Sequence, residues 1–329
     1  MNIPRVVSAG IATVVLAGCA TASTAHPGQP VPPSQPVPPS QPVSWAAAPY
    51  DYFAAGGPAP VQIMKATGVH AFTLAFIVSG GGCTPVWNGP DPRAAITAIR
   101  AAGGDVAVSF GGAGDTKLGV TCGSPGALAG AYQQVISTYR LRAIDLDLED
   151  TEVATPAVRQ RVISALAIVR QHNPGLYISV TMAGAPQGPD ASGQDLIARA
   201  AASGLRINAW TIMPIDFVPT EPDMSRVSVR AAEGLKTDLE NAYHESAAAA
   251  YKTMGISSIA GKDNTGDIMT PAAFQIVLDY VQAHNLARFT FWSVNRDRPC
   301  VQGTSTAADS CSGIPQPYYA FTQIIERRA

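Results

Sequence analysis

The stretch Arg142-Ala143-Ile144-Asp145-Leu146-Asp147-Leu148-Glu149 places three carboxylates at every second position of an otherwise apolar run. In an extended strand alternate side chains share one face, so Asp145, Asp147 and Glu149 would project together, each about 7 Å along the strand from the next. Carboxylates held so close repel one another and raise at least one pKa, which suits a site that keeps a protonated acid near neutral pH. A solvated strand face would carry the same pattern, so the pattern alone leaves both interpretations open.

Apolar, β-rich runs alternate with amphipathic helical stretches along most of the chain, as in a parallel sheet built from β–α units. The predicted strands are Tyr50–Ala54, Ala71–Ser79, Asp105–Phe110, Ala143–Leu148, Tyr177–Met182, Asn208–Met213, Ser257–Gly261 and Phe289–Val294. Four helices should begin at a capping residue followed by proline, whose missing N–H would be unbonded in the first turn anyway. These starts are Asp91-Pro92, Ser124-Pro125, Thr155-Pro156 and Thr270-Pro271.

Eight strands with crossover helices in about 280 residues predict an α/β fold of the (β/α)8 type, the TIM barrel. In that fold the active site lies at the carboxyl ends of the strands. An open, doubly wound sheet is the alternative, but no glycine-rich phosphate loop follows the first predicted strand.

Residues 1–19 have the layout of a signal peptide, in which Arg5 supplies the positive charge and Val6–Leu16 is too short an apolar run to span a bilayer. The ending Leu16-Ala17-Gly18-Cys19 resembles the bacterial lipobox, whose cysteine becomes the lipidated first residue of the mature protein. A plain secretory peptide cut between Ala20 and Ala25 is the alternative. We therefore expect an exported protein, extracellular or in the cell envelope, attached through a lipid on Cys19 to the outer face of a membrane.

Residues 20–44 are rich in proline, serine and glutamine and contain the hexapeptide Gln-Pro-Val-Pro-Pro-Ser twice, at 29–34 and 35–40. Such a composition cannot build a core and is typical of an extended polyproline II tether. The predicted organisation is a signal peptide with lipobox over 1–19, a Pro-rich linker over 20–44 and one barrel domain over 45–329.

The composition limits the domain size and the kinds of partner that we expect. The 329 residues are 47% hydrophobic and 14% charged, enough for one large single-core domain plus extensions. With a net charge of −2 and no cluster of lysine or arginine, nothing indicates a nucleic-acid or acidic-lipid partner, and we expect no nucleic acid. We expect a monomer.

With Cys19 set aside, four cysteines remain, and an even number in an exported protein indicates disulfides. Proximity favours Cys300 with Cys311, which leaves Cys83 with Cys122. A zinc site is the competing interpretation, but the chain has no C-x-x-C and no H-E-x-x-H. We expect neither a metal nor another cofactor.

The acidic stretch resembles the end of the fourth barrel strand in glycoside hydrolase family 18, the chitinase family, which reads D-x-x-D-x-D-x-E. Asp145, Asp147 and Glu149 match the last three acidic positions, whereas Arg142 stands where the first aspartate usually is. The replaced position lies at the start of the strand, so it should matter little to the chemistry.

Three further segments resemble signatures of the same family, in the family's order. They are Ser109-Phe110-Gly111-Gly112, similar to S-x-G-G of the third strand, Met213-Pro214-Ile215-Asp216, similar to M-x-Y-D of the sixth, and Phe291-Trp292-Ser293, similar to the eighth-strand segment that places a tryptophan under the sugar. The resemblance covers Tyr50 to Phe321. It is nearest to secreted actinobacterial chitinases that share the ending Phe291-Trp292-Ser293-Val294-Asn295-Arg296-Asp297.

The resemblance implies a retaining mechanism in which the substrate's own acetamido oxygen attacks the anomeric carbon. Glu149 would be the general acid and then the base that activates water. Asp147 would hold the acetamido N–H and stabilise the oxazolinium cation, and Asp145 would share a proton with Asp147.

The resemblance also implies substrate contacts by Ser109, Gly111, Gly112, Met213, Asp216 and Trp292. Ser109 and the two glycines would equally suit a tight turn, and Trp292 a core position. Ile215 replaces the family's tyrosine, whose hydroxyl binds the acetamido oxygen. That contact is either lost or supplied by a neighbour such as Asn295 or Asp216.

The sequence thus predicts an exported hydrolase of β-1,4-linked N-acetylglucosamine polymers, chitin or chitooligosaccharides. An endo-N-acetylglucosaminidase acting on glycans or cell wall uses the same chemistry and is the first alternative. The second is a carbohydrate-binding lectin on the same barrel. Retention of Glu149 argues against the lectin, and loss of the tyrosine argues for it.

Overall fold

The computed structural model describes residues 43–114, 116–301 and 309–328. The predicted signal peptide, the lipobox with Cys19 and nearly all of the Pro-rich linker lie outside the described residues. Within the described part no helix is long and apolar enough to cross a membrane.

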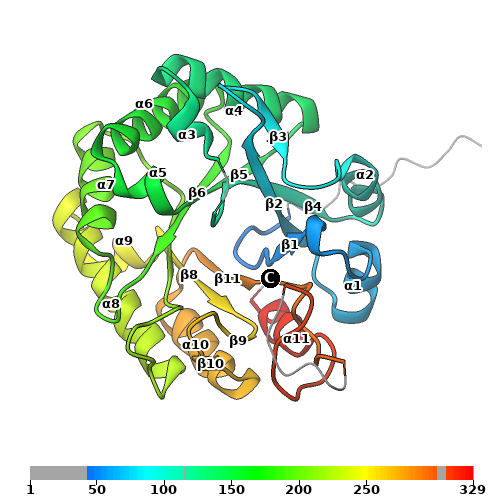
Figure 1. Ribbon diagram of the computed structural model, residues 1–329. Coiled ribbons are helices and arrows are strands. Elements are labelled where there is room, and N and C mark those ends of the chain that lie inside the picture. Colours follow the sequence, from blue (N-terminus) through cyan, green and yellow to red (C-terminus); the bar gives the residue numbers. More distant parts are fainter. Residues whose placement is uncertain (1–42, 115, 302–308, 329) are drawn as a thin grey trace, which may run out of the picture. The chain divides into compact units, whose positions relative to one another are not determined.

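A (β/α)8 barrel is the architecture, with a central ring of parallel strands and helices outside it (Figure 1). The strands, in their order around the ring, are β1 (Tyr50–Tyr52), β2 (Ala71–Ser79), β4 (Asp105–Gly111), β5 (Ala143–Leu148), β6 (Tyr177–Ala183), β7 (Ala209–Met213), β8 (Met254–Ile259) and β11 (Arg288–Trp292). The amide of Val294 donates to the carbonyl of Tyr50 at 2.9 Å, which brings the last strand back to the first. The predicted fold class is therefore confirmed.

The helices and minor elements occupy the connections between the barrel strands. The helices are α1 (Pro60–Thr67), α2 (Arg93–Ala101), α3 (Leu118–Thr121), α4 (Pro125–Tyr139), α5 (Asp150–Ala154), α6 (Pro156–His172), α7 (Ala191–Ala202), α8 (Met224–Tyr243), α9 (Ala247–Tyr251), α10 (Pro271–His284) and α11 (Ala320–Glu326), with a 3₁₀ turn η1 (Phe53–Ala55). Strand β3 (Pro85–Trp87) pairs antiparallel with β2, and β9 (Gly261–Lys262) pairs antiparallel with β10 (Ile268–Met269).

Three of the four predicted helix starts have the predicted N-cap residue and proline, but Thr155 makes no side-chain capping bond. Ser124 Oγ accepts from the Ala127 amide at 3.2 Å and Thr270 Oγ1 from the Ala273 amide at 3.1 Å, while Pro125, Pro156 and Pro271 take the first helical position. The fourth start is one residue later than predicted. Pro92 is the N-cap of α2, and Asp91 accepts from the Arg93 amide at 2.9 Å.

Six of the eight barrel strands differ from their predicted bounds, and for β1 and β8 the reason is visible in the backbone. Strand β1 ends at Tyr52 because the chain turns into η1 there. Strand β8 begins at Met254 instead of Ser257, and it includes Gly255. A Cβ on Gly255 would lie 2.7 Å from the Arg288 carbonyl oxygen, so glycine lets β11 approach at a place where strand propensity is low.

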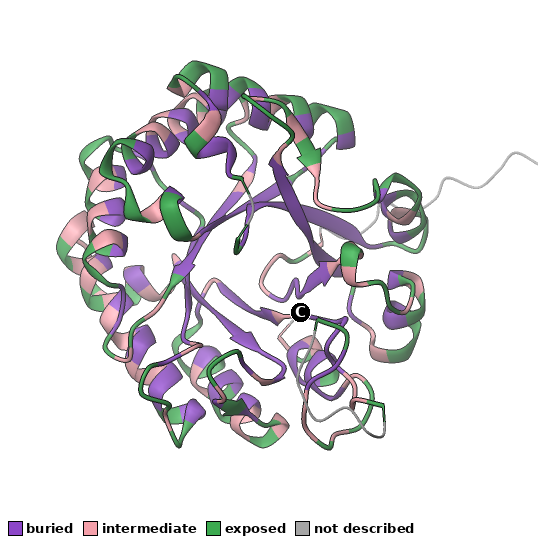
Figure 2. Ribbon diagram, viewed as in Figure 1, coloured by how far each residue is buried: buried purple, intermediate pink, exposed green. Residues whose placement is uncertain are grey.

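The core occupies both faces of the barrel wall, and the strands are buried almost throughout (Figure 2). All six residues of β5 are buried, because helices cover the outer face and side chains from other strands fill the inside. Arg288 crosses the interior, donating to Thr73 Oγ1 at 3.0 Å and pairing with Asp145 at 3.1 Å. The barrel interior therefore contains a buried ion pair below the acidic stretch.

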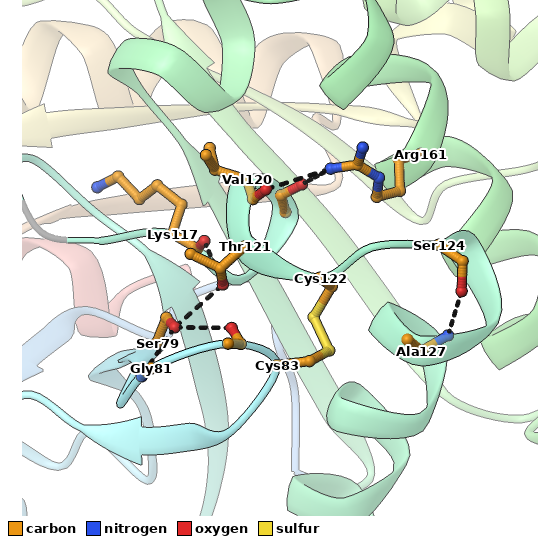
Figure 3. Close-up of a disulfide and its surroundings, with 12 residues drawn as sticks. Ser79, Gly81, Cys83, Lys117, Val120, Thr121, Cys122, Ser124, Ala127 and Arg161 are labelled. Carbon is orange, nitrogen blue, oxygen red and sulfur yellow. Dashed lines mark hydrogen bonds between the residues drawn. A yellow bond between two sulfur atoms is a disulfide. The ribbon is translucent and has the colours of Figure 1, made fainter.

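Both predicted disulfides are present. Cys83 is bonded to Cys122 with a Cα–Cα distance of 4.5 Å, and Cys300 to Cys311 with 4.9 Å. The first ties the loop after β2 to the residue that ends α3 (Figure 3). It thus fixes a connection on the rim where the strands end.

Candidate active site

A cavity of about 280 Å³ opens at the carboxyl ends of the strands. Strand residues and the loops that follow contribute its wall, which comprises Tyr50, Tyr52, Phe76, Asn88, Ala113, Asp147, Glu149, Met213, Ile215, Asp216, Ser257, Ile259, Asn264, Trp292, Arg296 and Asp309. This is where a (β/α)8 barrel places its active site. Of the residues singled out from the sequence, Asp147, Glu149, Met213, Asp216 and Trp292 line it.

Asp145 lies beneath the cavity, fully buried on β5. One carboxylate oxygen accepts from Tyr50 Oη at 2.8 Å and Ser109 Oγ at 2.7 Å. The other accepts from Ser179 at 2.6 Å and Thr181 at 2.9 Å and pairs with Arg288. Five donors therefore satisfy both oxygens of this buried carboxylate. The charge of Asp145 raises the pKa of Asp147. The proton sharing that the resemblance implied stays a prediction.

Asp147, two residues on, has the opposite surroundings. It is 4% exposed, and its Oδ1 has no hydrogen-bond partner within the described residues. Burial raises the pKa of Asp147 well above its usual value, and the charges of Glu149 and Asp145 raise it further. A protonated or weakly solvated oxygen thus lies at the cavity wall, ready to bind a polar group of a ligand.

Glu149 follows β5 and occupies the N-cap position of α5, partly exposed to the cavity. Burial raises its pKa to about 7, with Lys117 opposing this and Asp150 and Asp216 adding to it. A carboxyl that is half protonated near neutral pH is suited to proton transfer in both directions.

The opposite wall comes from the segment after β7. Asp216 has a φ of 58°, donates its amide to Asp263 at 2.7 Å and accepts from the backbone and side-chain nitrogens of Asn264, each at 2.8 Å. The carboxylate is therefore held in place at the cavity. Ile215 and Met213 add apolar surface beside it.

Aromatic rings form another side of the cavity. Trp292 is stacked on Phe76, with centroids 5.4 Å apart and planes 8° apart, and lies 5.3 Å from Tyr52. Its indole N–H donates to Asp309 at 3.3 Å. Trp292 therefore faces the cavity from an aromatic cluster, and flat apolar surfaces of this kind suit the faces of sugar rings.

Sequence reasoning missed Tyr52 and Phe76 as cavity residues. Both were within predicted strands, near the carboxyl ends of the first two, and that position was the available signal. Ser257, Asn264 and Arg296 were missed as well. Arg296 lies within the quoted C-terminal motif, but no pattern marked the other two.

Ser109, Gly111 and Gly112, for which the resemblance implied substrate contacts, do not line the cavity. Ser109 is fully buried and donates to Asp145 instead. A Cβ on Gly111 would lie 2.2 Å from the Asp147 carbonyl oxygen, and one on Gly112 would lie 2.6 Å from the Phe76 ring. Both glycines have positive φ, so this segment lets β4 and β5 end close together. Its role is to position Asp145, Asp147 and Phe76.

Asn295 does not line the cavity either. It is 3% exposed, and its amide nitrogen donates to the carbonyls of Gly56 at 2.7 Å and Tyr52 at 3.2 Å and to Asp51 at 3.2 Å. Its oxygen accepts from the Tyr52 amide at 2.7 Å. These contacts use the whole amide, so Asn295 is no substitute donor for the missing tyrosine.

Arg142 and the candidate metal ligands were also considered from the sequence. Arg142 pairs with Asp105 at 2.8 Å, at the opposite end of the strands from the cavity. Among the described residues, no group of three or more histidine, cysteine, aspartate or glutamate side chains is arranged to hold a metal ion.

No family model matches the chain. It is 28% identical over 301 residues to the probable bifunctional chitinase/lysozyme of Escherichia coli (strain K12), an alignment that covers 84% of this chain and 34% of that protein. It is 27% identical over 257 residues to Endochitinase 11 of Metarhizium anisopliae, covering 72% and 49% respectively. The chain thus spans between a third and a half of the length of these relatives.

Among solved structures, the catalytic domain of a hyperthermophilic chitinase from Pyrococcus furiosus superimposes with a TM-score of 0.79 at 26% identity, covering 88% of this chain and 96% of that one. Its barrel is therefore equivalent to almost the whole described domain. The relatives of this chain and the structures that it resembles are chitinases, several of them of glycoside hydrolase family 18.

Proposed function

We propose that this chain hydrolyses β-1,4-linked N-acetylglucosamine polymers, chitin or chitooligosaccharides, with retention of configuration. One observation carries the proposal: Glu149, with a pKa of about 7, lies at the cavity wall two residues from the unpartnered oxygen of Asp147. The chitinases among its relatives support the same conclusion.

In the first step Glu149 gives its proton to the glycosidic oxygen while the acetamido oxygen of the sugar attacks the anomeric carbon. The bond to the leaving sugar breaks, and its electron pair goes to the protonated oxygen. Asp147 accepts the acetamido N–H, which orients the nucleophile and stabilises the positive charge that develops on the ring.

In the second step the Glu149 carboxylate takes a proton from water, and the water oxygen attacks the anomeric carbon from the side that the leaving sugar occupied. The oxazolinium ring opens, the acetamide is restored and Glu149 is protonated again. Two displacements at one carbon return the β-anomer. Trp292 would lie under the sugar during both steps.

The experiment is hydrolysis of a chitooligosaccharide, with the first product observed by NMR. We expect the β-anomer and a loss of about 10²- to 10⁴-fold in kcat for Glu149→Gln, since that change deletes a proton donor at nearly constant volume. Glu326→Gln, on α11 and outside the cavity wall, is the matched control. Activity of Glu149→Gln within about tenfold of wild type would contradict the acid assignment, and an α-product would contradict the acetamido nucleophile.

One alternative is favoured by a specific observation. The E. coli relative's name includes lysozyme, and the proposed mechanism requires only an N-acetyl group beside the scissile bond. Assays of peptidoglycan and glycoprotein glycans beside chitin distinguish these substrates. Chitosan, which is deacetylated, should be a poor substrate whichever of the three is hydrolysed. Binding of chitooligosaccharide without turnover would favour the lectin, to which Ile215 in the tyrosine position lends support.

The proposal extends to where the protein acts. The signal-peptide layout of residues 1–19 and the lipobox cysteine, Cys19, support export and a lipid anchor of the kind expected for a secreted actinobacterial chitinase. Membrane fractionation of the full chain and of Cys19→Ala tests the anchor, since the variant should appear only in the soluble fraction.

A further inference from the structure

Lys117 is a buried lysine that the proposed mechanism has not used. It precedes α3 and is 2% exposed, and its ammonium nitrogen has no hydrogen-bond partner within the described residues. It pairs only loosely with Asp150, at 4.0 Å. A buried charge costs free energy unless hydrogen bonds or opposite charges compensate it. For the buried Lys117 ammonium, this compensation must come mainly from nearby negative charges.

Those charges belong to the acidic segment that begins at Asp147. The Lys117 ammonium lowers the pKa values of Asp147, Glu149 and Glu152, in each case against a larger upward effect of burial. Asp150 and Asp216 act on Glu149 in the opposite direction, and Arg288 acts on Asp147 from below. Lys117 is thus the cation that opposes burial at Glu149 among the described residues.

Local contacts fix the backbone that carries this lysine. The Lys117 carbonyl accepts from the Thr121 amide at 3.1 Å. The single hydroxyl hydrogen of Thr121 is shared between this carbonyl at 3.1 Å and Ser79 Oγ at 3.0 Å. The Cys83–Cys122 disulfide closes the same segment, and Figure 3 shows the Lys117 side chain leaving it on the side away from the sulfur atoms. The Gly119 amide donates to Glu152 at 2.9 Å, which ties α3 to α5.

Lys117 does not line the cavity, whereas Asp147 and Glu149 do. The ammonium therefore acts on these carboxyls from within the protein and has no contact with a substrate there. When Glu149 gives up its proton, the resulting anion must be stabilised where burial disfavours it.

We propose that Lys117 is a positioning residue of the proposed hydrolase, whose buried ammonium stabilises the Glu149 carboxylate that forms each time the acid has donated its proton. The inference rests on the proposed function for its meaning. It can nonetheless be tested without turnover, because it states a direction of charge interaction between two named side chains.

The first test is an NMR titration of the Glu149 carboxyl in protein labelled with [13C]glutamate, with the signal assigned by Glu149→Gln. In Lys117→Met, which keeps the length of the side chain and removes its charge, the Glu149 midpoint should rise by roughly one pH unit or more. The high-pH limb of kcat/KM should move in the same direction. Lys117→Arg should restore both, and Lys65→Met, at an exposed lysine of α1, should change neither.

Asp150→Asn supplies a test of opposite sign, since Asp150 raises the pKa of Glu149. In this variant the titration midpoint of Glu149 should fall. Loosening of the loop alone would not shift the Glu149 midpoint in opposite directions in Lys117→Met and Asp150→Asn. Should Lys117→Met not fold, judged by near-ultraviolet circular dichroism, Lys117→Gln replaces it as the uncharged variant.

An unchanged Glu149 midpoint in a folded, uncharged variant would overturn the proposal, even if activity fell equally at every pH. A wild-type chain that hydrolyses no N-acetylated substrate would instead overturn the proposed function, and the NMR titration would still decide the interaction between Lys117 and Glu149.

Discussion

In the proposed mechanism Glu149 is protonated when the glycosidic bond breaks and ionised when water attacks, so a pKa raised by burial to about 7 would let one carboxyl serve both steps. Because burial raises this pKa, the active acid form is present below about pH 7 and is lost as the pH rises through it. We predict that kcat/KM for a chitooligosaccharide falls above neutral pH, approaching a tenfold loss for each further unit. A pH–rate profile measures it. A profile that stays flat to pH 9, or that falls already near pH 4.5, would show that burial does not control this acid.

At the residue scale, alternation in the acidic stretch was enough to predict a shared face for Asp145, Asp147 and Glu149. It did not predict that Asp145 would be satisfied by five donors while Asp147 would have an unpartnered oxygen. That difference depends on Arg288, 143 positions away in the chain, and on hydroxyls from three other strands. The burial of Lys117 could not be predicted from the sequence for the same reason, since it depends on the path of a loop.

At the scale of elements, Asn295 joins the end of β11 to the start of η1, and its four hydrogen bonds close the barrel where β1 is only three residues long. We predict that Asn295→Ala lowers stability by roughly 1–3 kcal/mol, because it leaves buried partners unsatisfied. Thermal unfolding measures the loss, with Asn241→Ala on the exposed face of α8 as the control. A variant with unchanged Tm and strongly reduced kcat would instead indicate that Asn295 contacts substrate.

The elements that could be predicted were those with a long periodic pattern or a proline at the helix start. Strands β2 and β5 have their predicted bounds, and α4, α6 and α10 begin at their prolines. Strands β3, β9 and β10 have three residues or fewer, too short for any alternation to appear. Ser109, Gly111, Gly112 and Asn295 lie off the cavity wall, because a motif at a strand end can equally position its neighbours.

At the scale of the whole molecule, the barrel contains buried carboxyls whose pKa values are raised. Burial raises the pKa of Asp51 to about 7, opposed by its hydrogen bond from Asn295, and burial raises that of Glu152 to about 7, opposed by the Gly119 amide and Lys117. In the unfolded chain both would titrate near pH 4. The folded protein therefore binds more protons than the unfolded chain between about pH 4 and 7.

A raised pKa in the folded state contributes stability that is complete below the unfolded value and is lost as the pH rises through the folded value. We predict that the protein is more stable at pH 5 than at pH 8, with Asp51 and Glu152 each contributing on the order of 3 kcal/mol to the difference. Carboxyls with lowered pKa values act in the opposite direction, but they lose their contribution only below about pH 4. These are Asp195, Asp223 and Glu233.

Calorimetric unfolding of the wild type and of Asp51→Asn/Glu152→Gln at the two pH values measures this difference. The amides keep the shapes of the acids without titrating, so the double variant should lose the share of the dependence that comes from Asp51 and Glu152. The share of Asp147 and Glu149, whose pKa values burial also raises, should remain. Asp195→Asn, at a carboxyl whose pKa is lowered by hydrogen bonds from Arg199 and Arg159, is the control and should leave the dependence in that window unchanged. A wild type equally stable at both pH values would mean that these two buried carboxyls are solvated well enough to ionise at their ordinary pKa.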